Sequence, residues 1–287
     1  WNHTLRYTGS TIRVNYQTLS IQSNGKYTIQ SATAHQMSPY YQQDGVRETF
    51  DTDFSLGMYT INKPARKNGE VTLVRDPINQ AENPRKAWLY LPGQRRVRRA
   101  PSVAYDTPNP STNGKTTYDD AWLFSGAPDR FDWKLVGKKE LYIPYNNYKL
   151  DLPAKYDEII QQGAPHLNPE KGRYELHRVW VLEATVKEGE RHIYGKRKLY
   201  IDEDSWIVSI ADNYDTRGKL WRHHFTHLKS IYNLPSTMMF AHTFIDLNAG
   251  TMALADMHNE ETTNYYFNEP MKEKFFTPSS VRKLSRR

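Results

Sequence analysis

A two-residue alternation of apolar and polar side chains is the feature that most constrains this chain. In Thr11–Ile21, Ile12, Val14 and Tyr16 share one face, and the residues between them are mostly polar. This period is typical of a β-strand, in which successive side chains point to opposite faces. Further segments with strand character are Lys26–Ala34, Thr49–Asn62, Glu70–Arg75, Lys86–Leu91, Gln94–Ala100, Phe131–Val136, Glu140–Tyr145, Arg173–Val186, Ile193–Ile201, Trp206–Tyr214, Leu220–Ile231, Thr237–Asp246 and Thr251–Asp256.

Short turn sequences separate these segments. Asn-Gly pairs follow Ser23 and Lys67, and a Pro-Gly pair follows Leu91, which are residues that tight turns favour. About a dozen strands joined by short turns predict one large antiparallel sheet, strongly curved or rolled. The fold class is therefore mainly β. Residues 1–287 show no internal repeat and no convincing domain boundary, so we expect a single domain.

Helical signals are few and short. Tyr118–Phe124 places acidic residues ahead of an apolar cluster, and Lys155–Gly163 ends at a glycine, a usual helix stop. Thr277–Leu284 offers a threonine cap followed by proline. The proline-containing segment Ala100–Thr117 is the longest irregular piece, which predicts a mobile lid or flap.

Composition narrows the function classes. The chain has no cysteine, which excludes disulfides, cysteine-ligated zinc and thiol nucleophiles. A net charge of +7 is compatible with anionic surfaces and is also ordinary for basic soluble proteins. Twenty tyrosines, ten phenylalanines and seven tryptophans fit a strand-dominated protein. No apolar run reaches the length of about 18 residues that a membrane-spanning helix needs.

Four arginines in KAWLYLPGQRRVRRA raise the question of a polyanion site. If Gln94–Ala100 is a strand, Arg95 and Arg99 point to one face, whereas Arg96 and Arg98 point to the other. No single face then carries all four, which makes nucleic-acid binding the least favoured interpretation. Solvated arginines on the convex side of a curved sheet remain the simplest alternative. The other alternative is that these arginines contact a protein partner or a lipid headgroup.

Catalytic and nucleotide motifs are missing or incomplete. NGKTT at 113–117 resembles the end of a phosphate-binding loop, but Asn109 stands where that motif requires glycine, and no strand and helix flank it. No Gly-x-Ser-x-Gly nucleophile elbow occurs. We therefore predict no enzymatic activity, no catalytic residue and no cofactor.

Two clusters could bind a metal. His223 and His227 share a strand face, but the local sequence supplies no third ligand. Asp202, Glu203 and Asp204 lack the glycine and glutamate of a calcium loop, so a solvated hairpin turn is the favoured interpretation. We accordingly predict no metal site.

The middle of the chain resembles a known family. KAWLYLPGQRRVRRAP is followed by TTYDDAWLFSGAPDRFDWKLVGKKELYIPYN, whose WKLVGKKE we interpret as a strand pair, and later by KRKLYIDEDSWIVSIADNYDTRGKLWR. In this order the segments are similar to an uncharacterised family of outer-membrane lipoprotein-sorting-like proteins of Gram-negative bacteria, related in fold to the LolA and LolB carriers. The resemblance covers essentially the whole chain. Members usually carry a signal peptide and further residues ahead of the WNH segment, so we expect an N-terminal portion of the precursor to be missing here.

The resemblance implies a periplasmic protein, with possible association to the outer membrane. It implies an incomplete, half-open antiparallel β-barrel, with short helices covering the concave side. It also implies a ligand that is a lipid or another hydrophobic molecule, and a partner such as an RND-type exporter or an outer-membrane protein.

Three functions follow as hypotheses. The first is a non-catalytic carrier, the second an interaction module that docks an exporter without carrying a ligand, and the third, weakest, an enzyme acting on envelope polymers. For the carrier, aromatic side chains are the candidates for an apolar lining, and the arginines are the candidates for partner or headgroup contact. The candidate lining residues are Trp88, Tyr90, Trp122, Phe124, Trp133, Trp180 and Trp206, and the candidate contact residues are Arg95, Arg96, Arg98 and Arg99.

Overall fold

The computed structural model describes residues 11–41, 53–100, 103, 105–151, 153–232, 236–260 and 266–284. Strands dominate this part of the chain, as the alternation predicts. They are β1 (Thr11–Ile21), β2 (Tyr27–Met37), β3 (Asp53–Lys63), β4 (Val71–Pro77), β5 (Lys86–Leu91), β6 (Arg96–Arg99), β7 (Phe131–Pro144), β8 (Tyr174–Val186), β9 (Lys196–Asp202), β10 (Val208–Tyr214), β11 (Leu220–Ile231), β12 (Ser236–Asp246), β13 (Thr251–Met257) and β14 (Tyr266–Phe267).

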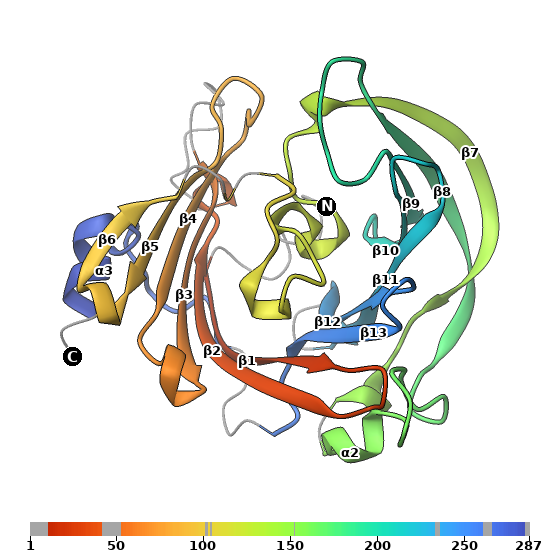
Figure 1. Ribbon diagram of the computed structural model, residues 1–287, viewed down its shortest axis with the longest axis horizontal. Helices are drawn as coiled ribbons and strands as arrows, with labels where there is room; N and C mark the ends of the chain where they lie inside the picture. Colours follow the sequence, from red (N-terminus) through yellow and green to blue (C-terminus); the bar gives the residue numbers. More distant parts are fainter. Residues whose placement is uncertain are drawn as a thin grey trace.

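All of these strands belong to one antiparallel sheet. Its order is β6-β5-β4-β3-β2-β1-β13-β12-β11-β10-β9-β8-β7, with β14 paired to β1. Two meanders therefore meet where β1 pairs with β13. The sheet is strongly curved, its end strands β6 and β7 lie on opposite sides of the molecule, and it does not close into a barrel (Figure 1). This confirms the predicted fold class.

The stretch 131–145 differs from the prediction. We expected two strands, Phe131–Val136 and Glu140–Tyr145, but β7 runs without interruption from Phe131 to Pro144. The register with β8 shifts between Leu135 and Gly137, and Gly137 has a φ of 137°. Gly137 is thus a bulge inside a strand rather than a turn between two strands, because glycine relieves the strain of an extra residue there.

Helical elements are short. The one-turn helix α2 (Tyr156–Ile159) and the helix α3 (Pro278–Leu284) lie inside two of the three segments where helices are predicted. The third predicted segment, Tyr118–Phe124, holds a kinked 3-10 turn instead. The remaining helical pieces are 3-10 turns, namely η1 (Pro39–Tyr41), η2 (Ala65–Lys67), η3 (Pro92–Gln94), η4 (Pro110–Thr112), η5 (Tyr118–Leu123), η6 (Pro128–Arg130), η7 (Tyr148–Leu150) and η8 (Glu273–Phe275). Among the described residues, no helix has the length and apolar character needed to cross a bilayer.

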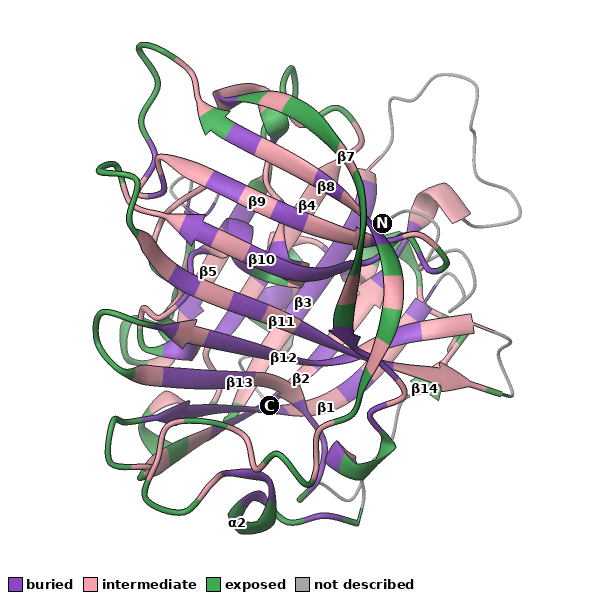
Figure 2. Ribbon diagram, turned by 90° about the vertical axis from the view of Figure 1, so that its right-hand side faces the viewer, coloured by how far each residue is buried: buried purple, intermediate pink, exposed green. Residues whose placement is uncertain are grey.

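The convex face of the sheet carries much of the apolar core. Tyr156 and Ile159 of α2 pack with Leu19, Ile21 and neighbouring residues from β12 and β13. On the other meander, Phe276, which follows η8, and Val281 of α3 pack on β2–β5. The burial pattern reflects this covering, because β12 and β13 are mostly buried whereas the edge strand β7 is largely exposed (Figure 2).

The concave face is filled by the segment that connects the two meanders. We call residues 105–130, which include η4, η5 and η6, the plug; they lie inside the curve of the sheet (Figure 1). On one side Leu123 and Phe124 pack against residues of β9–β13, including Leu199 and Phe244. On the other side Tyr118 packs against a cluster built on Ala87 of β5. The plug therefore contacts both halves of the sheet.

A buried charge network attaches the plug to the sheet. Arg197 of β9, which is fully buried, donates to Asp119 Oδ2 at 2.7 Å and to Asp120 Oδ1 at 3.2 Å. His192 Nε2 lies 3.0 Å from Asp119 Oδ2, and the Tyr194 hydroxyl donates to Asp120 at 2.9 Å. Burial opposes ionisation of Asp119, but Arg197 and His192 outweigh it and lower its pKa. The acidic pair in the YDD sequence is thus an anchor for the plug.

Candidate functional site

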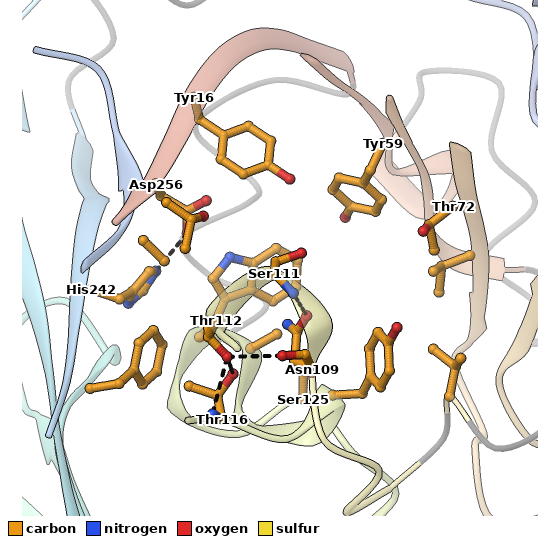
Figure 3. A pocket seen from close by; sticks show the side chains of 18 of the residues that line it. Tyr16, Tyr59, Thr72, Asn109, Ser111, Thr112, Thr116, Ser125, His242 and Asp256 are labelled. Atoms are coloured by element: carbon orange, nitrogen blue, oxygen red, sulfur yellow. Dashed lines mark hydrogen bonds and ion pairs between the residues drawn. The ribbon is translucent and has the colours of Figure 1, made fainter. Parts of the chain in front are cut away.

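A cavity of about 200 Å³ lies between the plug and the concave face of the sheet. Figure 3 shows its labelled side chains pointing inward from β1, β3 and β4 on one side, from β12 and β13 on another, and from the plug. Val74, Val103, Phe244 and Ala255 supply apolar surface. Tyrosine, threonine, aspartate and histidine side chains supply polar groups, so the cavity is amphipathic rather than purely apolar.

Asp256 reaches the cavity through a bulge in β13. The register between β1 and β13 shifts between Gln17 and Leu19, and Asp256 has a φ of 58°, in the left-handed region. Aspartate tolerates this conformation better than most residues, and bulges commonly redirect side chains next to functional sites. The side chain is 40% exposed, and it lines the cavity (Figure 3). Burial raises the pKa of Asp256 to about 6.

Two tyrosine hydroxyls face the same space. Figure 3 shows Tyr16 of β1 and Tyr59 of β3 on the sheet side of the cavity. Gln36 Nε2 donates to the Tyr59 hydroxyl at 3.1 Å. Gly57 leaves the room for this ring, because a Cβ there would lie 2.7 Å from the Tyr59 hydroxyl. Burial, Asp256 and Tyr59 together raise the pKa of Tyr16, which places the three oxygens within electrostatic reach of one another.

The basic groups around the cavity differ in charge. His242 Nε2 lies 3.4 Å from Asp256 Oδ2, but burial and the imidazoles of His227 and His224 lower the pKa of His242 to about 3, so it is neutral. Arg85 is already paired with Asp76, and it donates to the Ser125 carbonyl of the plug at 3.0 Å. Among the described residues, Asp256 therefore faces the cavity without a cationic partner.

Strained backbone presents the plug to the cavity. Trp122 and Leu123 are consecutive residues with φ values of 52° and 67°, an unfavourable region for bulky side chains. The resulting kink sends Leu123 into the sheet, where it is completely buried, and leaves Trp122 on the cavity wall. Packing on both sides holds the kink in place.

The structure separates the seven aromatic residues predicted to form a lining. Trp122 lines the cavity, whereas Trp88 and Tyr90 belong to the convex cluster beneath α3. Phe124 and Trp133 pack edge to face between the plug and the sheet.

The last two predicted lining residues lie on other parts of the sheet. Trp180 of β8 stacks against Lys138 of β7, and Trp206 is 49% exposed at the turn after β9. The contribution of all seven residues to ligand binding stays a prediction.

The arginines divide between two faces at a sheet edge. Arg95 ends η3 in a left-handed conformation, with a φ of 50°. In β6, Val97 packs with the convex cluster, and Arg99 shares its side, whereas Arg96 and Arg98 alternate to the other side. Arg96, Arg98 and Arg99 are exposed. Their role in binding a partner also stays a prediction.

Sequence reasoning missed most of the residues that shape the cavity. Tyr16 was placed on an apolar strand face, but Tyr59, Asp256 and His242 were not singled out. The available signal was that several strands each carry a polar side chain on the face that points inward. Only the register of the sheet brings these strands together, and the bulge at Asp256 leaves no mark in the alternation.

The carboxylate turn after β9 is different from the prediction. Asp202 was expected in a solvated turn, but it is completely buried. Its Oδ2 accepts from the Ser205 backbone and hydroxyl, and its Oδ1 lies 2.9 Å from His177 Nδ1. These contacts with Ser205 and with His177 of β8 enclose the Asp202 carboxylate and hold the turn against β8.

The two metal candidates are placed apart. His177, Asp202 and Asp204 form the one group of three closely spaced candidate ligands in the described part of the chain. The two histidines of the other candidate, His223 and His227, have separate partners. His223 contacts Asp212, and His227 contacts Thr243.

Comparison with solved structures shows the fold. A candidate outer membrane lipoprotein-sorting protein domain from Vibrio parahaemolyticus gives a TM-score of 0.64 at 13% identity, covering 96% of this chain and 92% of that one. A DUF1329 protein from Desulfovibrio piger gives 0.64 at 18% identity, with coverages of 98% and 96%. The LolA superfamily protein NE2245 from Nitrosomonas europaea gives 0.56 at 13% identity, with coverages of 97% and 95%. The fold is therefore LolA-like.

Comparison of sequences shows the family. The uncharacterized protein PA3922 of Pseudomonas aeruginosa is 44% identical over 297 residues, which cover 98% of this chain and 62% of that protein. The chain thus spans less than two thirds of the length of this relative. Residues 1–282 match the family described as protein of unknown function (DUF1329). The lipoprotein-sorting-like resemblance is confirmed, and the chain belongs to the DUF1329 family.

Proposed function

We propose that this protein is a non-catalytic carrier for a lipid or another hydrophobic molecule in the periplasm of a Gram-negative bacterium. The observation that carries the proposal is the amphipathic cavity on the concave face of a LolA-like sheet. Apolar walls desolvate part of a ligand, and a few polar groups orient it, which is the usual composition of a small-molecule site. The Vibrio neighbour is described as an outer membrane lipoprotein-sorting protein domain, which supports an envelope location.

The size of the cavity restricts how a cargo is held. Drug-sized ligands occupy pockets of about 300–1,000 Å³, whereas this cavity has about 200 Å³. A short chain or a single ring fits the cavity as it stands. A longer acyl chain requires movement of the plug, whose residues 105–117 are the main described part of the predicted flap Ala100–Thr117.

Extraction of bound cargo tests the carrier function. Protein purified without detergent is extracted with organic solvent, and the extract is analysed by mass spectrometry. We expect a hydrophobic molecule in the extract and its loss in Thr72→Trp, because Thr72 lines the cavity and an indole there fills it. Thr185→Trp, at an exposed position of β8, is the matched control and keeps the cargo. An empty wild-type protein that also binds no added hydrophobic probe would exclude the carrier function.

A second candidate is an interaction module that docks an RND-type exporter or an outer-membrane partner. It is favoured by the arginines of β6, which are exposed at a free sheet edge. Among the described residues, no carboxylate pairs with Arg96, Arg98 or Arg99, so these charges are available to a partner. Charge reversal on this strand distinguishes docking from carrying.

A further inference from the structure

The proposed carrier function leaves the chemical nature of the cargo open, and the polar wall of the cavity restricts it. On the sheet side of the cavity, the Asp256 carboxylate and the hydroxyls of Tyr16 and Tyr59 are among the acceptor groups. Asp256 is electrostatically coupled to both tyrosines. Among described residues, Tyr16 makes no hydrogen bond through its hydroxyl, and Tyr59 accepts one from Gln36, which leaves its own hydrogen free.

The charge balance of the wall is incomplete. Asp76 and Arg85 neutralise each other, and His242 is neutral at physiological pH, as described above. Ionised Asp256 thus leaves one uncompensated negative charge among the described residues of the wall. An ionised carboxylate on the wall of a narrow cavity is costly without a cationic partner, and a cation placed beside it reduces that cost.

We propose that the cavity binds a small amphiphile through a primary ammonium group, with Asp256 as the counter-ion and the hydroxyls of Tyr16 and Tyr59 as further acceptors. The inference rests on the proposed carrier function and names the class of its ligand. A primary ammonium has three N–H donors, and Asp256, Tyr16 and Tyr59 are three acceptor groups on the same wall. Aromatic rings add favourable electrostatics for a cation, and the cavity contains those of Tyr16, Tyr59 and Trp122.

The apolar part of the ligand is short. An apolar protein cavity of about 150 Å³ holds a benzene molecule, so a cavity of about 200 Å³ takes one ring or a chain of similar volume. Val74, Phe244 and Ala255 contact this part of the ligand from both halves of the sheet. A headgroup bound at Asp256 therefore has apolar surface on either side of it.

Three probes with the same six-carbon chain test the headgroup. Binding of n-hexylamine, 1-hexanol and hexanoate to the purified chain is measured by calorimetry at pH 7.5. We expect n-hexylamine to bind at least about tenfold more tightly than 1-hexanol, which corresponds to about 1.4 kcal/mol, and hexanoate to bind most weakly. At pH 5, where Asp256 is protonated, the advantage of the amine disappears.

Variants assign the selectivity to one carboxylate. In Asp256→Asn we expect n-hexylamine and 1-hexanol to bind with similar affinity at pH 7.5, while 1-hexanol binding persists and reports an intact cavity. Asp204→Asn, whose carboxylate is 76% exposed outside the cavity, keeps the selectivity of the wild type. Thermal unfolding of both variants verifies that they fold.

The outcomes separate the two proposals. Equal binding of amine and alcohol to the wild type, or amine selectivity that survives in Asp256→Asn, overturns the ammonium site and leaves the carrier function in place. Failure of all three probes, together with an empty solvent extract, overturns both.

Discussion

Arg197 joins the sheet to the plug through a buried ionic network. Its guanidinium bridges Asp119 and Asp120, and all three side chains are shielded from solvent. Removing one partner of a buried ionic network leaves the other charges uncompensated, which is far more destabilising than losing an exposed pair. The network also decides where the plug sits, because both carboxylates belong to η5.

Arg197→Met is expected to lower the free energy of unfolding by about 3–5 kcal/mol, the usual cost of breaking a buried ion pair from one side. Methionine retains much of the volume, so the loss reports the charge rather than a void. Arg178→Met is the matched control: Arg178 lies on the adjacent strand β8, is 60% exposed and pairs with Glu203, so we expect a much smaller loss. Urea unfolding followed by tryptophan fluorescence measures both. Equal losses in the two variants contradict the assignment.

The chemistry of single residues was predicted less well than their strands. Alternation places Arg96 and Arg98 on one face and Arg99 on the other, as the register with β5 confirms. Asp202 and Asp256 were out of reach, because the first is buried by a contact with His177 on another strand and the second is turned inward by a bulge. Both effects depend on tertiary pairing, which local periodicity does not contain.

At the level of elements, the two free edges of the sheet are protected in different ways. β6 has four residues, three of which are arginines, and charge on a short strand discourages pairing with another chain. β7 has fourteen residues and carries the Gly137 bulge together with exposed lysines. Leu135, Val136 and Tyr142 are nevertheless exposed on β7, so the two edges present different surfaces.

The double substitution Arg96→Glu/Arg98→Glu tests the docking alternative. If β6 docks an envelope partner, we expect capture of that partner from a membrane fraction to fall at least about tenfold while hydrophobic-probe binding is unchanged. Lys134→Glu/Lys139→Glu is the matched control, because it reverses two exposed charges on the opposite edge. If the β6 variant captures the partner as well as the wild type does, the docking role is contradicted, and the arginines of β6 serve only to discourage pairing with another chain.

Element positions follow closely from the sequence. The bounds of β1, β5 and β11 coincide with the predicted segments, since alternation and turn residues agree there. The prediction failed at β7, because a glycine between two strand-like runs indicates a turn as readily as a bulge. The resemblance implies short helices over the concave side, but the alternation alone does not place residues 105–130 there, because that position depends on Arg197, a residue far away in the sequence.

For the whole molecule, buried histidines make stability depend on pH. Burial lowers the pKa of His224 and of His258 to about 4 and that of His227 to about 3, and His242 behaves in the same way. The unfolded chain binds protons near the ordinary value of 6.5, whereas the folded chain does not. The stabilisation is therefore complete above pH 6.5 and is lost as pH falls towards 4.

We expect the free energy of unfolding to fall between pH 6.5 and 4.5, by about 1.4 kcal/mol per pH unit for each proton that only the unfolded chain binds. Asp256 opposes the trend, because its raised pKa favours the folded state as pH falls from 6 towards 3.8. Urea unfolding at several pH values measures the slope of the free energy of unfolding against pH. In His227→Leu we expect this slope to fall by the contribution of one proton, because one fewer histidine is protonated on unfolding. A flat profile in the wild type contradicts this account.

The attachment of the plug to both halves of the sheet has a mechanical consequence. Arg197 fastens the plug to β9, and Arg85, next to β5, fastens it at Ser125. The plug therefore connects the two meanders across the concave face, in addition to their direct pairing through β1 and β13. A molecule that displaces the plug breaks this second connection, so we expect the occupancy of the interior to be linked to the separation of the edge strands β6 and β7.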